Sequence, residues 1–198
     1  MPVAGEPCDL INGALYLIEG DGVNAGLTFA AAIPFAGWVA TGAKWCGIAI
    51  EVAPGVSKIL KITIEPSGLL KFSHNNSSQF REILNMSGSY WNDFQAHHLL
   101  PKNFWDHPTL QKAAQSKNFT FHMNHPRNGI PLHDSRHLGY HNNYNNQIEA
   151  LLTELDDLYP NANPSEIAVA IEGFQTYLKN LIEGSNQHIN DIVIDYTW

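Results

Sequence analysis

The sequence is poor in cysteine and in charged residues, and both shortages limit what the chain can be. Its two cysteines, Cys8 and Cys46, have no CxxC spacing and are too few for a disulfide framework or a thiolate zinc site. Only 15% of the 198 residues are charged, and the net charge is −8. This balance is unfavourable for a protein that approaches a polyanion through a broad positive field. With 44% hydrophobic residues, the chain is nevertheless expected to fold around a sizeable core.

The sequence also lacks an uninterrupted membrane span and a secretory signal peptide. Residues 22–43 contain no charged side chain, but Pro34 interrupts them and four glycines dilute them. Two short helices packed on each other fit this pattern better than a stable membrane span. The first six residues lack a basic stretch before an apolar core, so we expect no cleavable signal peptide. Export, if it occurs, then needs another secretion machine or a larger parent chain.

Charge is unevenly distributed along the chain. Residues 97–146 carry five basic and only two acidic side chains, whereas from Glu149 to the end nine acidic residues accompany only Lys179. The middle of the chain is therefore the part suited to meet phosphate, with Lys102, Arg127 and Arg136 as candidate substrate contacts. The acidic end is either a solvated face or a surface for a basic partner.

Eight of the ten histidines fall between residues 97 and 141. If His137 and His141 lie on one helix, their side chains share a face and can bind one divalent ion. The His97-His98 doublet can supply a third ligand, because neighbouring residues on a strand point to opposite sides. The other histidine of the doublet is then free to act as a base, since imidazole titrates near neutral pH. Each pattern alone also arises by chance in a histidine-rich chain.

The order of these motifs resembles that of a known family. The motifs are Ala96-His97-His98, then Asn128-Gly129-Ile130 with Leu132, then His137-Leu138-Gly139-Tyr140-His141 with Tyr144-Asn145. In this order they are similar to the AHH branch of the HNH/endonuclease VII nucleases, which occur as toxin modules of bacterial competition systems. The resemblance implies an α+β, mostly helical fold with a ββα-metal core, in which two short strands and a helix surround one metal ion.

The resemblance also implies a role for each motif residue. His97, His137 and His141 would hold one divalent metal ion, and His98 would be the general base. Asn128 would brace His98 through its side-chain or main-chain carbonyl and so fix the tautomer of the ring. Three imidazoles favour zinc, but the spacing leaves magnesium, manganese and nickel open.

A second resemblance concerns the N-terminal part. The stretch Ala40-Thr41-Gly42-Ala43-Lys44-Trp45 resembles the pre-toxin segment with a Thr-Gly motif that precedes nuclease cores in polymorphic toxins. We therefore expect a pre-toxin-like helical segment at 1–54 and a nuclease domain at 55–198. The two resemblances together imply a toxin that a specialised secretion system delivers into the cytoplasm of a target cell, with a cognate immunity protein as partner.

Local patterns predict the elements around these motifs. The pattern at residues 56–65 predicts a short strand or helix of uncertain type, and Phe80, Ile83 and Leu84 recur at helical spacing. Two further strands are predicted, one that leads into the His97-His98 doublet and one at 119–121. Three helices are predicted as well: one capped near His107, one from 134 or 135 through His141 to Leu155, and one that begins at Asn163 and ends at Gly184. Residues 192–194 suit a strand or a docking tail.

The resemblance implies a metal-dependent endonuclease that hydrolyses phosphodiester bonds of DNA, and two alternatives to it remain. The same ion chemistry would cleave RNA, and no base-reading motif decides between the two substrates. In the other alternative the histidines bind zinc for stability, and residues 22–43 make the protein a membrane-active or structural module. That alternative predicts dye leakage from liposomes and no cleavage of nucleic acid.

Overall fold

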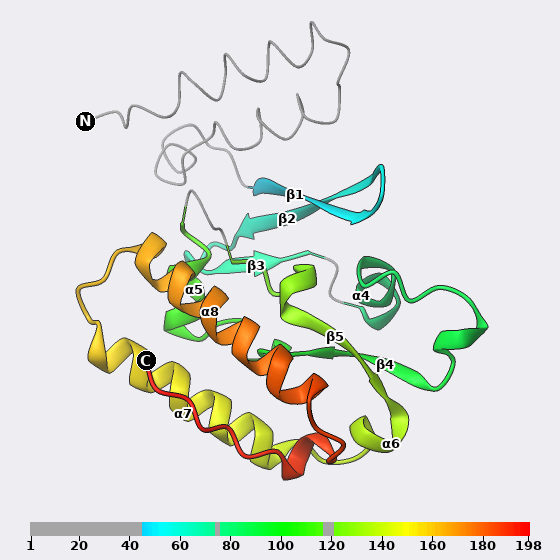
Figure 1. The fold of residues 1–198 in the computed structure, drawn as a ribbon. Helices are drawn as coiled ribbons and strands as arrows, with labels where there is room; N and C mark the ends of the chain where they lie inside the picture. Colours follow the sequence, from blue (N-terminus) through cyan, green and yellow to red (C-terminus); the bar gives the residue numbers. More distant parts are fainter. Residues whose placement is uncertain (1–44, 74–75, 117–120) are drawn as a thin grey trace, which may run out of the picture. The chain divides into compact units, whose positions relative to one another are not determined.

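The computed structural model describes residues 45–73, 76–116 and 121–198 (Figure 1). The chain divides into two compact units, Met1–Ser73 and His74–Trp198. The helical hairpin predicted for residues 22–43 and most of the strand predicted at 119–121 lie outside the described residues. None of the helices in the described ranges combines the length and the apolarity that crossing a bilayer requires.

The described part of the first unit is an antiparallel sheet in the order β1-β2-β3. Strand β1 (Trp45–Ala53) pairs with β2 (Val56–Ile64), and β2 pairs with β3 (Leu70–Phe72). The stretch of uncertain type at 56–65 is thus a strand, and its alternation of buried Leu60 and Ile62 with exposed neighbours is typical of one. Residue 54, where a domain boundary was expected, lies in the β1–β2 turn, and the compact units divide only after β3.

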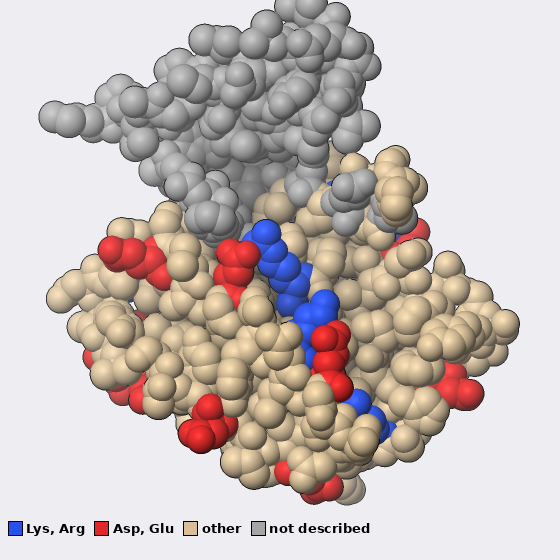
Figure 2. Space-filling view, viewed as in Figure 1, with Lys and Arg blue, Asp and Glu red and all other residues tan. Residues whose placement is uncertain are grey.

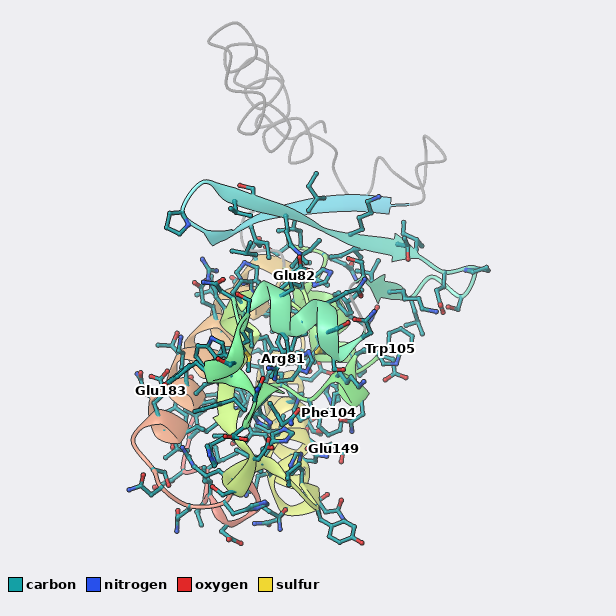
Figure 3. The ribbon with its side chains drawn as sticks, turned by 90° about the vertical axis from the view of Figure 1, so that its right-hand side faces the viewer. Arg81, Glu82, Phe104, Trp105, Glu149 and Glu183 are labelled. Carbon is teal, nitrogen blue, oxygen red and sulfur yellow. The ribbon has the colours of Figure 1, made fainter. Side chains whose placement is uncertain are left out.

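The second unit is built on a two-stranded antiparallel ladder. Strand β4 (Phe94–His98) pairs with β5 (Gly129–His133), and the register sets His98 opposite Gly129. Helix α4 (Ser77–Ile83) lies against β4 (Figure 1). The predicted strand through the histidine doublet is confirmed. Arg81 of α4, labelled in Figure 3, donates hydrogen bonds to the main-chain oxygens of Trp91, at 2.8 Å, and Phe94, and so fixes α4 on the entry to β4.

Helices supply most of the core of this unit. Helix α5 (Pro108–Ala113) packs against both α7 (Asn142–Leu158) and α8 (Pro164–Glu183). Helix α8 begins where predicted, with a capping box formed by Asn163 and Glu166, and Gly184 ends it. The buried face of α7 consists of Tyr144, Ile148, Leu151, Leu152 and Leu155. The described chain is therefore α+β and mostly helical, as expected.

The helix predicted from residue 134 through His141 is wrong as a single element. Helix α6 (Asp134–His137) ends at His137, and α7 begins only at Asn142. Gly139 lies between them with φ = +111°, a conformation that residues with a Cβ atom rarely adopt. The two histidines of the H-x3-H motif thus lie on either side of the turn between α6 and α7, and do not share the face of one helix. Residues 192–194 form no strand and instead run along α7, where Gln147 hydrogen-bonds to Ile192 and Ile194.

Asn128 links three parts of the second unit. Its side chain is fully buried, and its Oδ1 accepts hydrogen bonds from Leu100 N at 2.9 Å and from Gln175 Nε2 of α8 at 3.0 Å. Its Nδ2 donates to the main-chain oxygens of Leu100 and Met123, at 3.1 and 2.8 Å. The amide therefore needs both its donor and its acceptor at this position.

We expect Asn128→Asp to destabilise the protein by more than about 2 kcal/mol, because a carboxylate would face two carbonyl oxygens in a buried site. Urea unfolding measures this loss. The matched control is Asn163→Asp at the exposed cap of α8, where aspartate caps a helix as well as asparagine does. Equal stability of the two variants would contradict the assigned role of Asn128.

Candidate functional site

Three histidines converge at one end of the β4–β5 ladder. His97 comes from β4, His137 from the end of α6, and His141 from the position that precedes α7. Their ring centroids are 5.2 Å (His97 to His137), 5.8 Å (His97 to His141) and 4.6 Å (His137 to His141) apart. One nitrogen of each ring lies within 4.8 Å of the other two. The structure thus brings together the three residues that the sequence singled out as ligands.

His97 is the buried member of this group, with 4% of its surface exposed. Its Nε2 atom is buried and has no hydrogen-bond partner among the described residues. Leaving such an atom unpaired costs about 1–3 kcal/mol, so native structures rarely keep one. Burial, with added repulsion from His137 and His141, holds the pKa of His97 well below its ordinary value, so the ring is neutral. A neutral, unpaired imidazole beside two others fits a divalent cation that prefers nitrogen ligands.

The other two rings of the group, those of His137 and His141, are linked through the short segment that carries both. Burial, with repulsion from His141 next, lowers the pKa of His137 to about 4. His141 Nε2 hydrogen-bonds to the main-chain oxygen of His137 at 2.5 Å. Tyr144, in the first turn of α7, packs edge-on against His97 and donates its hydroxyl proton to Leu99 O at 2.7 Å. This last bond fixes the start of α7 to the end of β4.

His98 has quite different surroundings from those of its neighbour His97. Its ring stacks on Phe80 of α4, with centroids 3.9 Å apart, and its Nε2 lies 2.8 Å from Asn124 Oδ1. Because an amide oxygen only accepts, Nε2 carries the proton and Nδ1 keeps a lone pair. Burial lowers the pKa of His98 to about 4, the bond to Asn124 opposes the shift, and the charge of Lys102 adds to it. His98 is therefore neutral at pH 7 and able to accept a proton.

One cleft of about 260 Å³ is lined by the three clustered histidines and by His98. Lys102, Asn103 and Asn145 also line it, and Lys102 is the one candidate substrate contact that the structure places there. A nucleophile, a base and a phosphate could therefore meet in this cleft.

A family model matches residues 82–181, half of the chain, and describes a nuclease family of the HNH/ENDO VII superfamily with conserved AHH. The chain belongs to this family. It is thus a nuclease, and nucleic acid is its substrate. Nucleases of this superfamily use a divalent metal ion, and the chain has a histidine group that could hold one. No curated protein and no solved structure matches the chain. The family match does not reach the Thr-Gly stretch near residue 41, which stays a prediction.

In this AHH nuclease, Asn128 does not brace His98 as the sequence suggested. Its side chain is bound to Leu100, Met123 and Gln175, and its main-chain oxygen accepts from Leu99 N. The amide beside His98 belongs to Asn124, four residues earlier in the same turn. That prediction is wrong because the Asn128 amide faces Leu100, in the chain that leaves β4, and not the His98 ring.

Gly129 of the same motif has a steric role. A Cβ atom at this position would lie 2.5 Å from the ring tip of Phe80 and 2.8 Å from Leu84. Because Phe80 is the ring on which His98 stacks, the absence of a side chain at residue 129 lets α4 approach and support the His98 ring.

Two predicted substrate contacts lie outside the cleft. Arg127 forms an ion pair with Glu172 at 2.8 Å, and Arg136 donates to the main-chain oxygens of Gln187 and Ile182. On the face that Figure 2 presents, basic side chains of the described residues form only a narrow run with acidic ones beside it. Both arginines thus connect their own segments to α8 or to the chain that follows it. The distribution of charge along the sequence did not indicate these contacts.

Five further histidines act as local caps, which accounts for much of the unusual histidine content. In each, Nδ1 accepts a hydrogen bond of 3.0–3.3 Å from the main-chain N–H two residues later. The five are His107, His122, His125, His133 and His188. The cap predicted at His107 is confirmed.

Two partly buried, neutral histidines, His98 and His137, make stability dependent on pH. The folded pKa values of His98 and His137 are about 4, below the value of about 6.5 in the unfolded chain, so the unfolded state binds more protons between these values. We therefore expect the free energy of unfolding, measured with urea in the presence of a chelator, to fall as the pH drops from 6.5 to 5. His98→Asn should make this fall shallower. Constant stability across the window would contradict the assigned neutral state.

Proposed function

We propose that this nuclease is a metal-dependent endonuclease that hydrolyses phosphodiester bonds of DNA with His98 as general base. The observation that carries the proposal is the buried, unpaired Nε2 of His97 next to His137 and His141. A cation held there would give that nitrogen the partner that the described residues do not supply. His98 lines the same cleft, and its free nitrogen makes it the candidate base.

The ligand set would be His97, His137 and His141. A divalent ion held by them would supply charge stabilisation to the phosphate and lower the pKa of a water. Three imidazoles favour zinc, with nickel, manganese and magnesium as further candidates.

The chain's own contribution to the reaction lies in His98 and Lys102. Asn124 holds the proton on Nε2 of His98, so the lone pair on Nδ1 is available to take a proton from the attacking water. Stacking on Phe80 fixes the plane of the ring. Lys102 lines the same cleft and provides a positive charge for a phosphate oxygen.

The biological role is proposed on the family resemblance alone. The nuclease would be an antibacterial toxin, delivered by a specialised secretion system into the cytoplasm of a target cell. A cognate immunity protein would protect the producer. RNA is the alternative substrate, because the same ion chemistry would cleave either nucleic acid.

We expect His98→Ala to lower plasmid cleavage by about 10²- to 10⁴-fold, the usual worth of a general base, while metal binding is retained. His141→Ala should lose both cleavage and metal. His107→Ala is the matched control, because it removes a capping histidine outside the cleft and should leave cleavage unchanged. Plasmid nicking and metal content of the purified variants are the measurements. Unimpaired nicking by the His98 variant would overturn the assignment of the base.

A parallel incubation of the wild-type protein with plasmid and with total RNA tests the proposed substrate. We expect plasmid cleavage that is lost with a chelator and restored by a divalent ion. Cleavage of RNA alone would replace the DNA assignment with the RNA alternative. Dye leakage from liposomes without cleavage of either substrate would favour a membrane-active module.

A further inference from the structure

Helix α7 begins without a cap of its own. The residue at its N-cap position is His141, and this side chain makes no capping hydrogen bond. An N-cap side chain normally accepts from one of the first free N–H groups of the helix. His141 cannot do so because its ring is directed at His137 and His97. The histidine cluster therefore uses the His141 side chain that would otherwise cap the start of α7.

A residue from the far end of the chain supplies the missing acceptor. Asn190 Oδ1 accepts a hydrogen bond from Asn143 N, in the first turn of α7, at 2.8 Å. The side-chain amide of Asn143 in turn donates to the main-chain oxygen of Asn190 at 2.8 Å. Asn190 therefore caps α7 across 47 residues of sequence.

His188 holds the turn between the two histidines of the H-x3-H motif. Its Nε2 donates to Leu138 O at 2.9 Å, and its Nδ1 accepts from Asn190 N at 3.2 Å. Its ring centroid is 6.3 Å from that of His141. One imidazole thus links the turn at residue 138 to the residue that caps α7.

Arg136 anchors the other side of His137. Its guanidinium donates to Ile182 O at 2.8 Å and to Gln187 O at 3.0 Å. The segment with His137 and His141 is therefore fixed at residues 136, 138 and 143 by residues 182–190. All of these anchoring residues lie beyond residue 181, where the family match ends.

We propose that His188 and Asn190 are positioning residues that hold His137 and His141 in place for the metal ion. This inference rests on the proposed metal-dependent function. Helix ends fray unless their free N–H groups are satisfied, and fraying of α7 would move His141 first. Partners that orient metal ligands typically change metal affinity or activity by about 10- to 100-fold when they are removed.

The test is a titration of the full chain with Co²⁺, followed by its visible absorbance, with Zn²⁺ competition for the tighter sites. We expect Asn190→Ala to weaken Co²⁺ binding by about 10- to 100-fold. Asn190→Asp keeps the acceptor and should restore affinity to within a few-fold of the wild type. The matched control is Asn163→Ala, which removes an asparagine cap from α8. Its thermal midpoint should fall similarly, with Co²⁺ affinity unchanged.

A second pair of variants tests the histidine by the same titration. His188→Ala and His107→Ala each remove an Nδ1 cap of the same local geometry, but only His188 also contacts the turn at Leu138. We expect weaker Co²⁺ binding and an altered visible spectrum for His188→Ala alone. Circular dichroism identifies any variant that does not fold, and the Asn190 and His188 pairs each test the proposal independently.

Wild-type Co²⁺ affinity in folded Asn190→Ala and His188→Ala would overturn the positioning proposal and leave the proposed function intact. Equal weakening by the control variants would also overturn it, because general destabilisation would then explain the effect. Failure of the wild-type chain to bind Co²⁺ or Zn²⁺ would instead overturn the proposed function together with this inference.

Discussion

The buried Nε2 of His97 is the atom around which the site of this AHH nuclease is organised. It has no hydrogen-bond partner in the described part of the chain, and His137 and His141 lie beside it. Burying a polar atom in this way is unfavourable unless something satisfies it. A cation shared by the three imidazoles would do so, and the lowered pKa values of His97 and His137 keep these two rings neutral for it.

Strand geometry places the two histidines of the doublet in different surroundings, one for each of their proposed roles. Because neighbouring residues of β4 point to opposite sides, His97 joins the ligand cluster while His98 stacks on α4. Each side chain then has its own support: Tyr144 packs on His97, and Phe80 and Asn124 hold His98. Tight packing of α4 depends in turn on the glycine opposite His98 in the ladder. A ligand and a base can therefore be adjacent in sequence without competing for the same partners.

The sequence predicted the structure correctly where the interactions that determine it are local. Alternation along a strand predicted the split between His97 and His98, and the capping box at Asn163 predicted the start of α8. It failed where a residue's hydrogen-bond partner is distant in sequence, or where one pattern is compatible with two local conformations. The H-x3-H spacing suits a helix as well as a turn, and only the φ of +111° at Gly139 distinguishes them. Asn124 and Asn128 lie four residues apart, and only the folded structure shows that Asn124 is the one that meets His98.

The most direct test of the metal site is a crystal structure of the protein grown with Zn²⁺, with anomalous scattering collected at the zinc edge. The account predicts one anomalous peak about 2.0–2.1 Å from a nitrogen of each of the rings of His97, His137 and His141. It also predicts that His98 lies in the same cleft without touching the ion. A peak bound elsewhere, with His97 Nε2 satisfied by a hydrogen bond inside the protein, would contradict it.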